Sequence, residues 1–396
     1  YHHNAGRADE AERLYRDILR RSPGHPVAAT LLARLALKRG DFSKARALLM
    51  VAVAKAPDYM QAHVALGECH EQAWAQGPAT RAYRRALALA PEQAGTLVTL
   101  GNLEQQANND NVAGALYRRA LVIQPGSVAA ANNLAAACLK CADPIRALDA
   151  TDRVLESNPS HVRAIAYRTV ALRALGRDAE ADRFLGFGSL VTSTRLDPSS
   201  RYSDLAEFNG DLADALMTHP NISSEWDSAK RAIRGGAIVP RLLEHRVPVI
   251  EAFETFLRAT INGAIAALPD DRSHPYLARK PEADERGRYA LDIWGNLLGR
   301  SDHQSAHIHN LGWMSGVYYV TVPVPEPDED PRAGWIEFNR PGYGISVLGG
   351  EAGIEVIRPE PGMVILFPSY VWHGTIPFNG PGQRVSIAFD LHLPTS

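Results

Sequence analysis

The sequence predicts a multidomain protein in which an all-α helical repeat array precedes an antiparallel β domain of the jelly-roll type with flanking helices. Two observations carry this prediction. Prolines and alanines recur every 34 residues through the first half of the chain. Short β-rich runs, separated by Gly and Pro, follow from about residue 288. A chain of 396 residues is long enough for two hydrophobic cores.

The repeat register is visible in two residue types. Prolines stand at positions 23, 57, 91, 125 and 159, and alanines at positions 11, 45, 79, 113, 147 and 181. This pattern is typical of a helix-turn-helix solenoid, here of six units over residues 1–186. Each proline is expected to end the second helix of a unit. Small residues at 33, 67, 101 and 135 should let paired helices approach closely.

Glycine is also expected to mark the turn between the two helices of a unit. Gly6, Gly40 and Gly176 share this register position, and a positive φ is cheap only for glycine.

The repeat segments resemble a known family. Ala65-Leu-Gly-Glu68, Thr99-Leu-Gly-Asn102 and the Tyr-Arg-Arg-Ala-Leu stretches before Pro91 and Pro125 are similar to tetratricopeptide repeats. The resemblance implies a right-handed superhelix with a concave groove that holds a peptide or protein segment. Alternatively the array only dimerises or stiffens the protein, so a homodimer is a second expectation.

Composition excludes several classes of function. Residues 1–186 hold 24 Lys and Arg against 18 Asp and Glu, and residues 187–396 hold 18 against 26. This charge asymmetry is mild, and the sequence lacks the dense basic patch of a nucleic-acid-binding protein. No apolar run reaches the roughly 18 residues of a membrane span. Three cysteines are too few for a disulfide framework and favour the cytoplasm. The pair Cys138 and Cys141 is expected to pack in a helix rather than to bind zinc.

A polar, Pro-containing segment over residues 187–202 is predicted to be a linker, so the second domain should span 203–396 with its β core at about 288–394. Helical apolar spacing predicts helices over 203–218 and 247–267. Alternating apolar runs predict strands over 289–294, 306–310, 314–322, 334–338, 353–357, 363–367 and 384–392.

Histidines in this β region predict a metal site. His307 and His309 stand at i and i+2, so an extended segment points both imidazoles to one face. His373 follows about sixty residues later, and Arg384 and Ser386 come after it. Three imidazoles with open coordination positions are the layout of a catalytic transition-metal site. The Arg384 guanidinium is suited to a two-pronged pair with a carboxylate.

The stretches HIHNLGWMSGVYYV, GWIEF, EPGMVILFPSYVWHGTIPF and QRVSIAFD resemble the iron(II)- and 2-oxoglutarate-dependent oxygenases of bacteria that carry tetratricopeptide repeats. The resemblance implies a double-stranded β-helix, Fe(2+), 2-oxoglutarate as co-substrate and O2. His307 and His373 fall on the two iron histidines of the family. Arg384 and Ser386 fall on its RxS pattern, whose arginine binds the distal carboxylate of 2-oxoglutarate.

One position departs from the family pattern. His309 stands where the acidic iron ligand is expected. Either His309 is the third ligand, or two histidines suffice and water or co-substrate fills the position. Glu337 is a reserve carboxylate. Tyr318 and Tyr319 are both candidates for donating to 2-oxoglutarate, but alternation places them on opposite faces and leaves open which one faces inward.

The resulting prediction is a hydroxylase whose peptide or protein substrate is recruited by the repeat array. Two alternatives stay open at this point. Three histidines also occur in cupin-like dioxygenases that do not use 2-oxoglutarate, although the glutamate that cupins carry shortly after the HxH pair is missing. The repeats could also form a non-catalytic scaffold with an inactive β domain.

Overall fold

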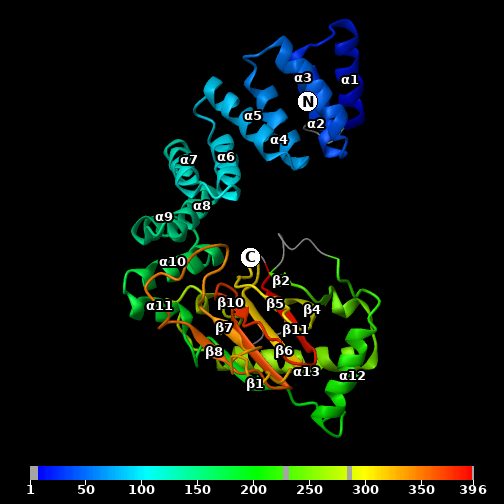
Figure 1. Cartoon of the computed structure of the whole chain (residues 1–396), viewed down its shortest axis with the longest axis vertical. Helices are drawn as coiled ribbons and strands as arrows, with labels where there is room; N and C mark the ends of the chain where they lie inside the picture. The colour runs from blue at the N-terminus through cyan, green and yellow to red at the C-terminus, as the bar shows by residue number, and fades with distance from the viewer. Residues whose placement is uncertain (1–7, 226–231, 283–287, 395–396) are drawn as a thin grey trace. The chain divides into compact units, whose positions relative to one another are not determined.

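The structure, a computed structural model, describes residues 8–225, 232–282 and 288–394. The chain forms two compact units, residues 1–141 and 142–396 (Figure 1). Among the helices in the described ranges, none combines the length and the apolar composition that crossing a bilayer requires.

Helices recur with the predicted period of 34 residues. The first helix of successive pairs begins at Pro26, Met60, Ala94, Val128 and Val162. Over the described residues the array consists of α1 (Ala8–Arg21), α2 (Pro26–Lys38), α3 (Phe42–Lys55), α4 (Met60–Gln72), α5 (Gln76–Leu89), α6 (Ala94–Gln106), α7 (Asp110–Ile123), α8 (Val128–Lys140), α9 (Pro144–Ser157), α10 (Val162–Ala174) and α11 (Asp178–Leu185). The predicted helical repeat is therefore confirmed.

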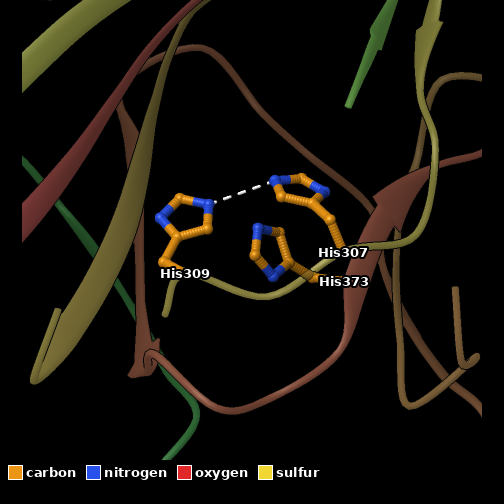
Figure 2. Close-up of side chains that lie close together, drawn as sticks. All are labelled: His307, His309 and His373. Atoms are coloured by element: carbon orange, nitrogen blue, oxygen red, sulfur yellow. Dashed lines mark hydrogen bonds between the residues drawn. The ribbon is translucent and has the colours of Figure 1, made fainter. Parts of the chain in front are cut away.

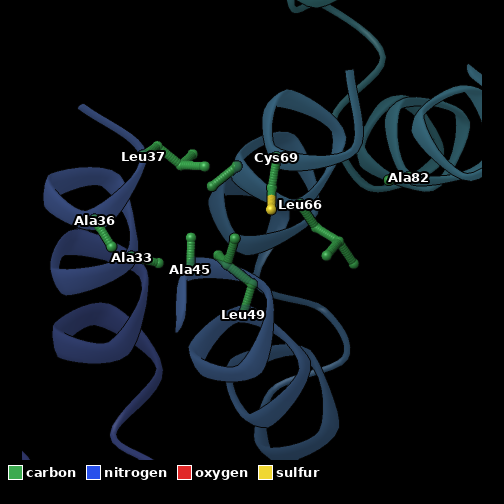
Figure 3. Packing of buried hydrophobic residues seen from close by; sticks show 9 residues of the cluster. Ala33, Ala36, Leu37, Ala45, Leu49, Leu66, Cys69 and Ala82 are labelled. Carbon is green, nitrogen blue, oxygen red and sulfur yellow. The ribbon is translucent and has the colours of Figure 1, made fainter. Parts of the chain in front are cut away.

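Small residues bring the helices of a pair together, as predicted. A Cβ atom on Gly67 would lie 2.6 Å from the ring of Tyr83, and one on Gly101 would lie 2.5 Å from the ring of Tyr117. Real Cβ atoms do not approach this closely, so each tyrosine occupies the space that its glycine leaves free. Figure 3 shows a neighbouring part of the core, where alanines and leucines of α2 to α5 pack around Cys69.

The turn inside each unit has a positive φ, but glycine occupies it in only some of the units. Gly40 and Gly176 have φ of 77° and 68°, while Trp74, Asn108 and Ala142 have φ of 57°, 59° and 55° at the equivalent positions. At Trp74 and Asn108, packing of α4 on α5 and of α6 on α7 imposes this conformation at a cost of roughly 1–2 kcal/mol for a side chain that bears a Cβ. Gly6 lies outside the described residues. The repeating prolines stand two residues beyond the preceding helix ends.

The last repeat helices pack against the β domain and belong to the second unit. The indole Nε1 of Trp372 donates to the carbonyl of Ala166 in α10 at 3.1 Å. The hydroxyl of Tyr370 donates to the carbonyl of Phe184 in α11 at 2.7 Å. The compact units therefore divide at residues 141 and 142, not after the end of the repeat pattern near residue 186.

The described strands pair antiparallel throughout. A six-stranded sheet has the order β1-β9-β6-β11-β4-β3, a three-stranded sheet the order β10-β7-β8, and β2 pairs with β5. The strands are β1 (Thr192–Arg195), β2 (Ile233–Arg234), β3 (Ala237–Val239), β4 (Ala290–Leu298), β5 (His303–Gln304), β6 (Met314–Thr321), β7 (Ile336–Phe338), β8 (Glu355–Ile357), β9 (Met363–Pro368), β10 (His373–Thr375) and β11 (Arg384–His392). The antiparallel β-rich character is as predicted.

Two segments differ from the prediction. The expected linker at 187–202 contains β1, which pairs with β9 from Thr192 opposite Leu366 onward and so forms an edge of the large sheet. Residues 306–310 do not form a regular strand, because only His307 bridges, to His373. The predicted helices are present as α12 (Leu205–Met217) and α13 (Pro248–Ala267), and α12 packs on β6.

Candidate functional site

Three histidines from two separate segments converge (Figure 2). His307 and His309 lie between β5 and β6, and His373 begins β10. Backbone hydrogen bonds of 2.9 and 3.1 Å join His307 and His373 in both directions. The Nε2 atoms of His307 and His309 lie 3.1 Å apart. One ligand nitrogen from each ring lies within 4.8 Å of the others, so a single ion could contact all three.

Hydrogen bonds on the far side of each ring decide its tautomer. The Nδ1 atom of His307 lies 2.8 Å from the carbonyl of Ser305, and that of His373 lies 3.0 Å from the carbonyl of Val371. A carbonyl only accepts, so each Nδ1 carries the proton and each Nε2 keeps a lone pair. Lone pairs that converge without a shared proton repel one another, and a divalent transition metal removes this repulsion.

Burial keeps two of these imidazoles neutral. It lowers the pKa of His307 to about 3, with a further contribution from neighbouring His309. It also holds the pKa of His373 well below the ordinary value, again with the other two histidines adding to the effect. Neutral imidazole is the form that binds a metal, so the rings are ready as ligands without losing a proton.

A carboxylate stands behind the third histidine. The Nδ1 atom of His309 donates to Oδ1 of Asp390 at 2.5 Å, and the Ser315 hydroxyl donates to the same oxygen at 2.6 Å. Burial by itself raises the pKa of the Asp390 carboxyl, but His309 and Ser315 outweigh burial and lower that pKa. A carboxylate in this position fixes the ring orientation and makes the imidazole a stronger donor.

Sequence reasoning missed Asp390, although a signal was present. Arg384 and Asp390 both lie on β11, six residues apart, and the period of two places them on one face of the strand. In the family pattern an acidic side chain binds the metal directly. In this chain the carboxylate of Asp390 instead lies behind His309, one side chain further from the proposed metal position.

Arg384 is a buried cation with only neutral partners. Its side chain is 1% exposed. One terminal nitrogen donates to the Thr375 hydroxyl at 2.5 Å and the other to the Tyr319 hydroxyl at 3.2 Å. Its Nε has no hydrogen-bond partner, and no described carboxylate lies within ion-pair distance. A buried charge without a counter-charge is costly, so this guanidinium fits an anionic ligand.

The histidines and Arg384 line one cavity, called here the inner cavity. Its other walls come from both sheets and include Tyr319 of β6, Ile336 of β7 and Phe367 of β9. Ser386 is buried opposite Tyr319 in the strand ladder and is not among the residues that line the cavity.

Two sequence-predicted residues lie away from the cavity. The hydroxyl of Tyr318 donates to Asn209 of α12 at 2.5 Å on the opposite face of β6, so Tyr319 is the tyrosine that faces inward. Strand alternation is the physical reason that removes Tyr318 from the candidate site. The Glu337 carboxylate accepts from Arg340 at 2.6 and 3.1 Å and is outside the histidine cluster.

A second pocket of about 360 Å³, called here the outer pocket, also reaches the cluster. It shares His307, His309, Trp294 and Gln304 with the inner cavity. The Trp294 ring lies 5.6 Å from that of His309, measured between centroids. An ion on the histidines would therefore contact one space that contains Arg384 and another that lacks it.

His309 is the ligand on which the family pattern and this chain differ. We expect His309→Ala to weaken iron binding strongly, and His309→Asp to retain it because a carboxylate restores the common ligand set. Asp390→Asn should lower iron affinity by about 10- to 100-fold, since it removes the charge behind an intact imidazole. Iron affinity measured by anaerobic titration checks all three variants.

Unchanged affinity in His309→Ala would identify an arrangement with two histidine ligands. In that case Asp390→Asn should also bind iron like the parent.

Comparisons with known proteins agree with this geometry. The family model described as "Putative 2OG-Fe(II) oxygenase" matches residues 292–390, and a tetratricopeptide repeat model matches residues 3–73. A comparison with curated proteins found no match.

Several solved structures align with part of the chain. A crystal structure of MamA aligns with 22% identity and a TM-score of 0.37, covering 40% of this chain and 92% of MamA. YrrB, described as a TPR protein with an unusual peptide-binding site, aligns with 16% identity and a TM-score of 0.40, covering 42% and 86%. TTC0263, a thermophilic TPR protein of Thermus thermophilus, aligns with 23% identity and a TM-score of 0.33, covering 45% and 92%.

The family models identify parts of the chain: residues 3–73 match tetratricopeptide repeats, and residues 292–390 match the family described as putative 2OG-Fe(II) oxygenase.

Proposed function

We propose that the chain is an iron(II)- and 2-oxoglutarate-dependent dioxygenase. In this proposal His307, His309 and His373 hold the iron, and Arg384 binds the distal carboxylate of 2-oxoglutarate. The observation that carries it is the shared inner cavity, which is lined by three convergent imidazoles and by a buried arginine without a counter-charge. The two larger sheets both contribute walls to this cavity, which supports a double-stranded β-helix.

The donor set fits both groups. Three neutral imidazoles leave the full charge of iron(II) in place, and dianionic 2-oxoglutarate would offset two of the three positive charges that iron(II) and Arg384 carry together. When bound, iron(II) and 2-oxoglutarate supply an O2-derived oxidant that hydroxylates the substrate, with succinate and CO2 as the other products.

The residues of the chain hold and shield this chemistry. Tyr319 and Thr375 fix the plane of the Arg384 guanidinium through their hydroxyls. Backbone carbonyls and Asp390 fix the three ring orientations. Buried Ile336 and Phe367 give the inner cavity an apolar wall, beside which charge interactions are stronger than in water.

An anaerobic titration tests the proposal directly. Iron(II) is added to the protein, followed by 2-oxoglutarate, while the visible absorption is recorded. A charge-transfer band of the iron chelate that saturates with 2-oxoglutarate is expected. Iron binding without this band would favour a second candidate function, a dioxygenase that does not use 2-oxoglutarate.

That second candidate is a cupin-like dioxygenase that does not use 2-oxoglutarate, and the three-histidine donor set favours it. Arg384 separates the two candidates, because only the 2-oxoglutarate enzyme requires an anion-binding arginine in the cavity.

We further propose a peptide or protein substrate. A tetratricopeptide repeat match supports it, because such arrays offer long concave surfaces. Binding a remote part of the substrate there would raise the effective concentration of the reacting residue at the iron.

Deleting residues 1–141 should leave iron and 2-oxoglutarate binding intact, because this deletion follows the division between compact units. It should reduce hydroxylation of the true substrate through a higher KM, since the remote contacts are lost. Hydroxylation kinetics and the anaerobic titration on the same preparation check both parts. An unchanged KM would limit the array to a structural role and favour a small-molecule substrate.

A longer deletion, of residues 1–186, serves as the comparison. It also removes α10 and α11, whose carbonyls accept from Trp372 and Tyr370. We expect this longer deletion to destabilise the β domain and to lower its thermal unfolding temperature.

A further inference from the structure

A large pocket of about 1010 Å³ lies beside the outer pocket. Its walls come from the turn between α9 and α10 at residues 158–162, from Arg272 and residues 278–282, from Arg288, and from residues 310–312 and 393–394. Asn310 and Leu311 line both this pocket and the outer pocket, so the two spaces adjoin. Leu311 is 86% exposed, which leaves this shared wall open to solvent.

The large pocket is basic. Four cationic side chains, Arg272, Arg279, Lys280 and Arg288, line it against the single carboxylate of Glu282. Two of these charges are neutralised: Arg272 pairs with Glu282, and Lys280 pairs with Asp270 at 2.7 Å.

Arg279 and Arg288 are exposed and form no ion pair with any residue in the described ranges. Among the described residues the pocket, called here the basic pocket, therefore presents two guanidinium groups that have no ion-pair partner. The guanidinium group of arginine is the side-chain group best suited to bind carboxylates in two-pronged pairs.

The outer pocket has the opposite charge. Asp292 and Asp390 pair across β4 and β11, and both line the outer pocket. A ligand that runs from the basic pocket to the histidines therefore passes from a cationic wall to an anionic one. A nucleic acid carries a negative charge on every unit and would meet the carboxylates of Asp292 and Asp390 at the second wall, whereas a peptide can carry different charges along its length.

We infer that the substrate is a peptide segment with acidic side chains that bind in the basic pocket, beside a residue of other charge that enters the outer pocket. This inference rests on the proposed oxygenase function and adds the chemical class of the substrate. It also assigns a recognition role to the end of the repeat array, because Asn158 and His161 at the turn between α9 and α10 form part of the same pocket.

The test uses the full-length protein and three fluorescein-labelled probes: hexaglutamate, hexaglutamine and hexalysine. Fluorescence anisotropy measures their binding at low salt. We expect hexaglutamate to bind most tightly and its affinity to fall as salt is added. Arg279→Glu and Arg288→Glu should each weaken hexaglutamate binding by about tenfold, the equivalent of one charge-assisted pair.

Arg358→Glu is the matched control. Arg358 is an exposed arginine between β8 and β9 that lines none of the pockets described above, so the same charge reversal there should leave hexaglutamate binding unchanged. Equal affinity for the three peptides, equal loss in all three variants, or tighter binding of a fluorescein-labelled single-stranded oligonucleotide would each overturn the inference.

Failure of this inference can be told apart from failure of the proposed function. Peptide binding needs neither iron nor 2-oxoglutarate, whereas the charge-transfer titration needs no peptide. A saturating chelate band without charge-dependent peptide binding would leave the oxygenase proposal standing and overturn only the acidic substrate.

Discussion

His373→Ala is expected to abolish stoichiometric iron(II) binding. His373 is buried beside the other two imidazoles, with ring centroids 4.2 Å from His307 and 4.9 Å from His309. Its removal leaves at most two of the three proposed protein ligands, and no described carboxylate takes its place. His307→Ala should behave in the same way. Metal content after anaerobic reconstitution and desalting measures the effect.

His303→Ala is the control for this pair. His303 lies on β5 only a few residues from the cluster, but its Nδ1 is near the carbonyl of Ser301 and its ring is not part of the cluster. Iron content should equal that of the parent. Because His373 is buried, a thermal melt of each variant is needed to show that loss of iron is not loss of fold. A folded His373→Ala protein with full iron content would remove this residue from the site.

Arg384→Ala is expected to raise the 2-oxoglutarate concentration required for half-saturation by tenfold or more. Loss of a hydrogen-bonded charge pair costs on the order of 2 kcal/mol, and about 1.4 kcal/mol corresponds to a factor of ten. The same anaerobic absorption titration measures the change, with iron content determined in parallel. Iron content should be unaffected, because the arginine contacts hydroxyls rather than the imidazoles.

Arg384→Lys separates charge from geometry. It keeps a cation in the cavity but loses the planar fork, so its 2-oxoglutarate affinity should fall between that of the parent and that of Arg384→Ala. Parent-like affinity in both variants would assign Arg384 to a structural role and favour the cupin-like candidate.

Local sequence rules predicted most of the repeat array. The period of 34 located each helix pair, because every unit must bury the same face against its neighbours. The same rules failed at the intra-unit turn, where Trp74 and Asn108 adopt a positive φ that a side chain with a Cβ disfavours. Helix packing outweighs a local preference of this size.

The residues of the candidate site that follow a sequence pattern were predictable. The i, i+2 spacing of His307 and His309, the later His373 and the Arg384 to Ser386 pattern were visible in the chain. The partners that orient these residues were not, because Thr375 and Asp390 are ordinary residues until the fold brings them to Arg384 and His309.

The sequence by itself determined the repeat class, the β-rich second half and the residues with metal-binding chemistry, because periodicity and residue type are local properties. Tertiary structure decided that Tyr319 rather than Tyr318 faces the cavity, and that Glu337 is engaged by Arg340. It also placed Arg279 and Arg288 in one pocket beside the outer pocket. These outcomes depend on which face of a strand meets which sheet and on which loops adjoin, and such long-range contacts leave no trace in local spacing.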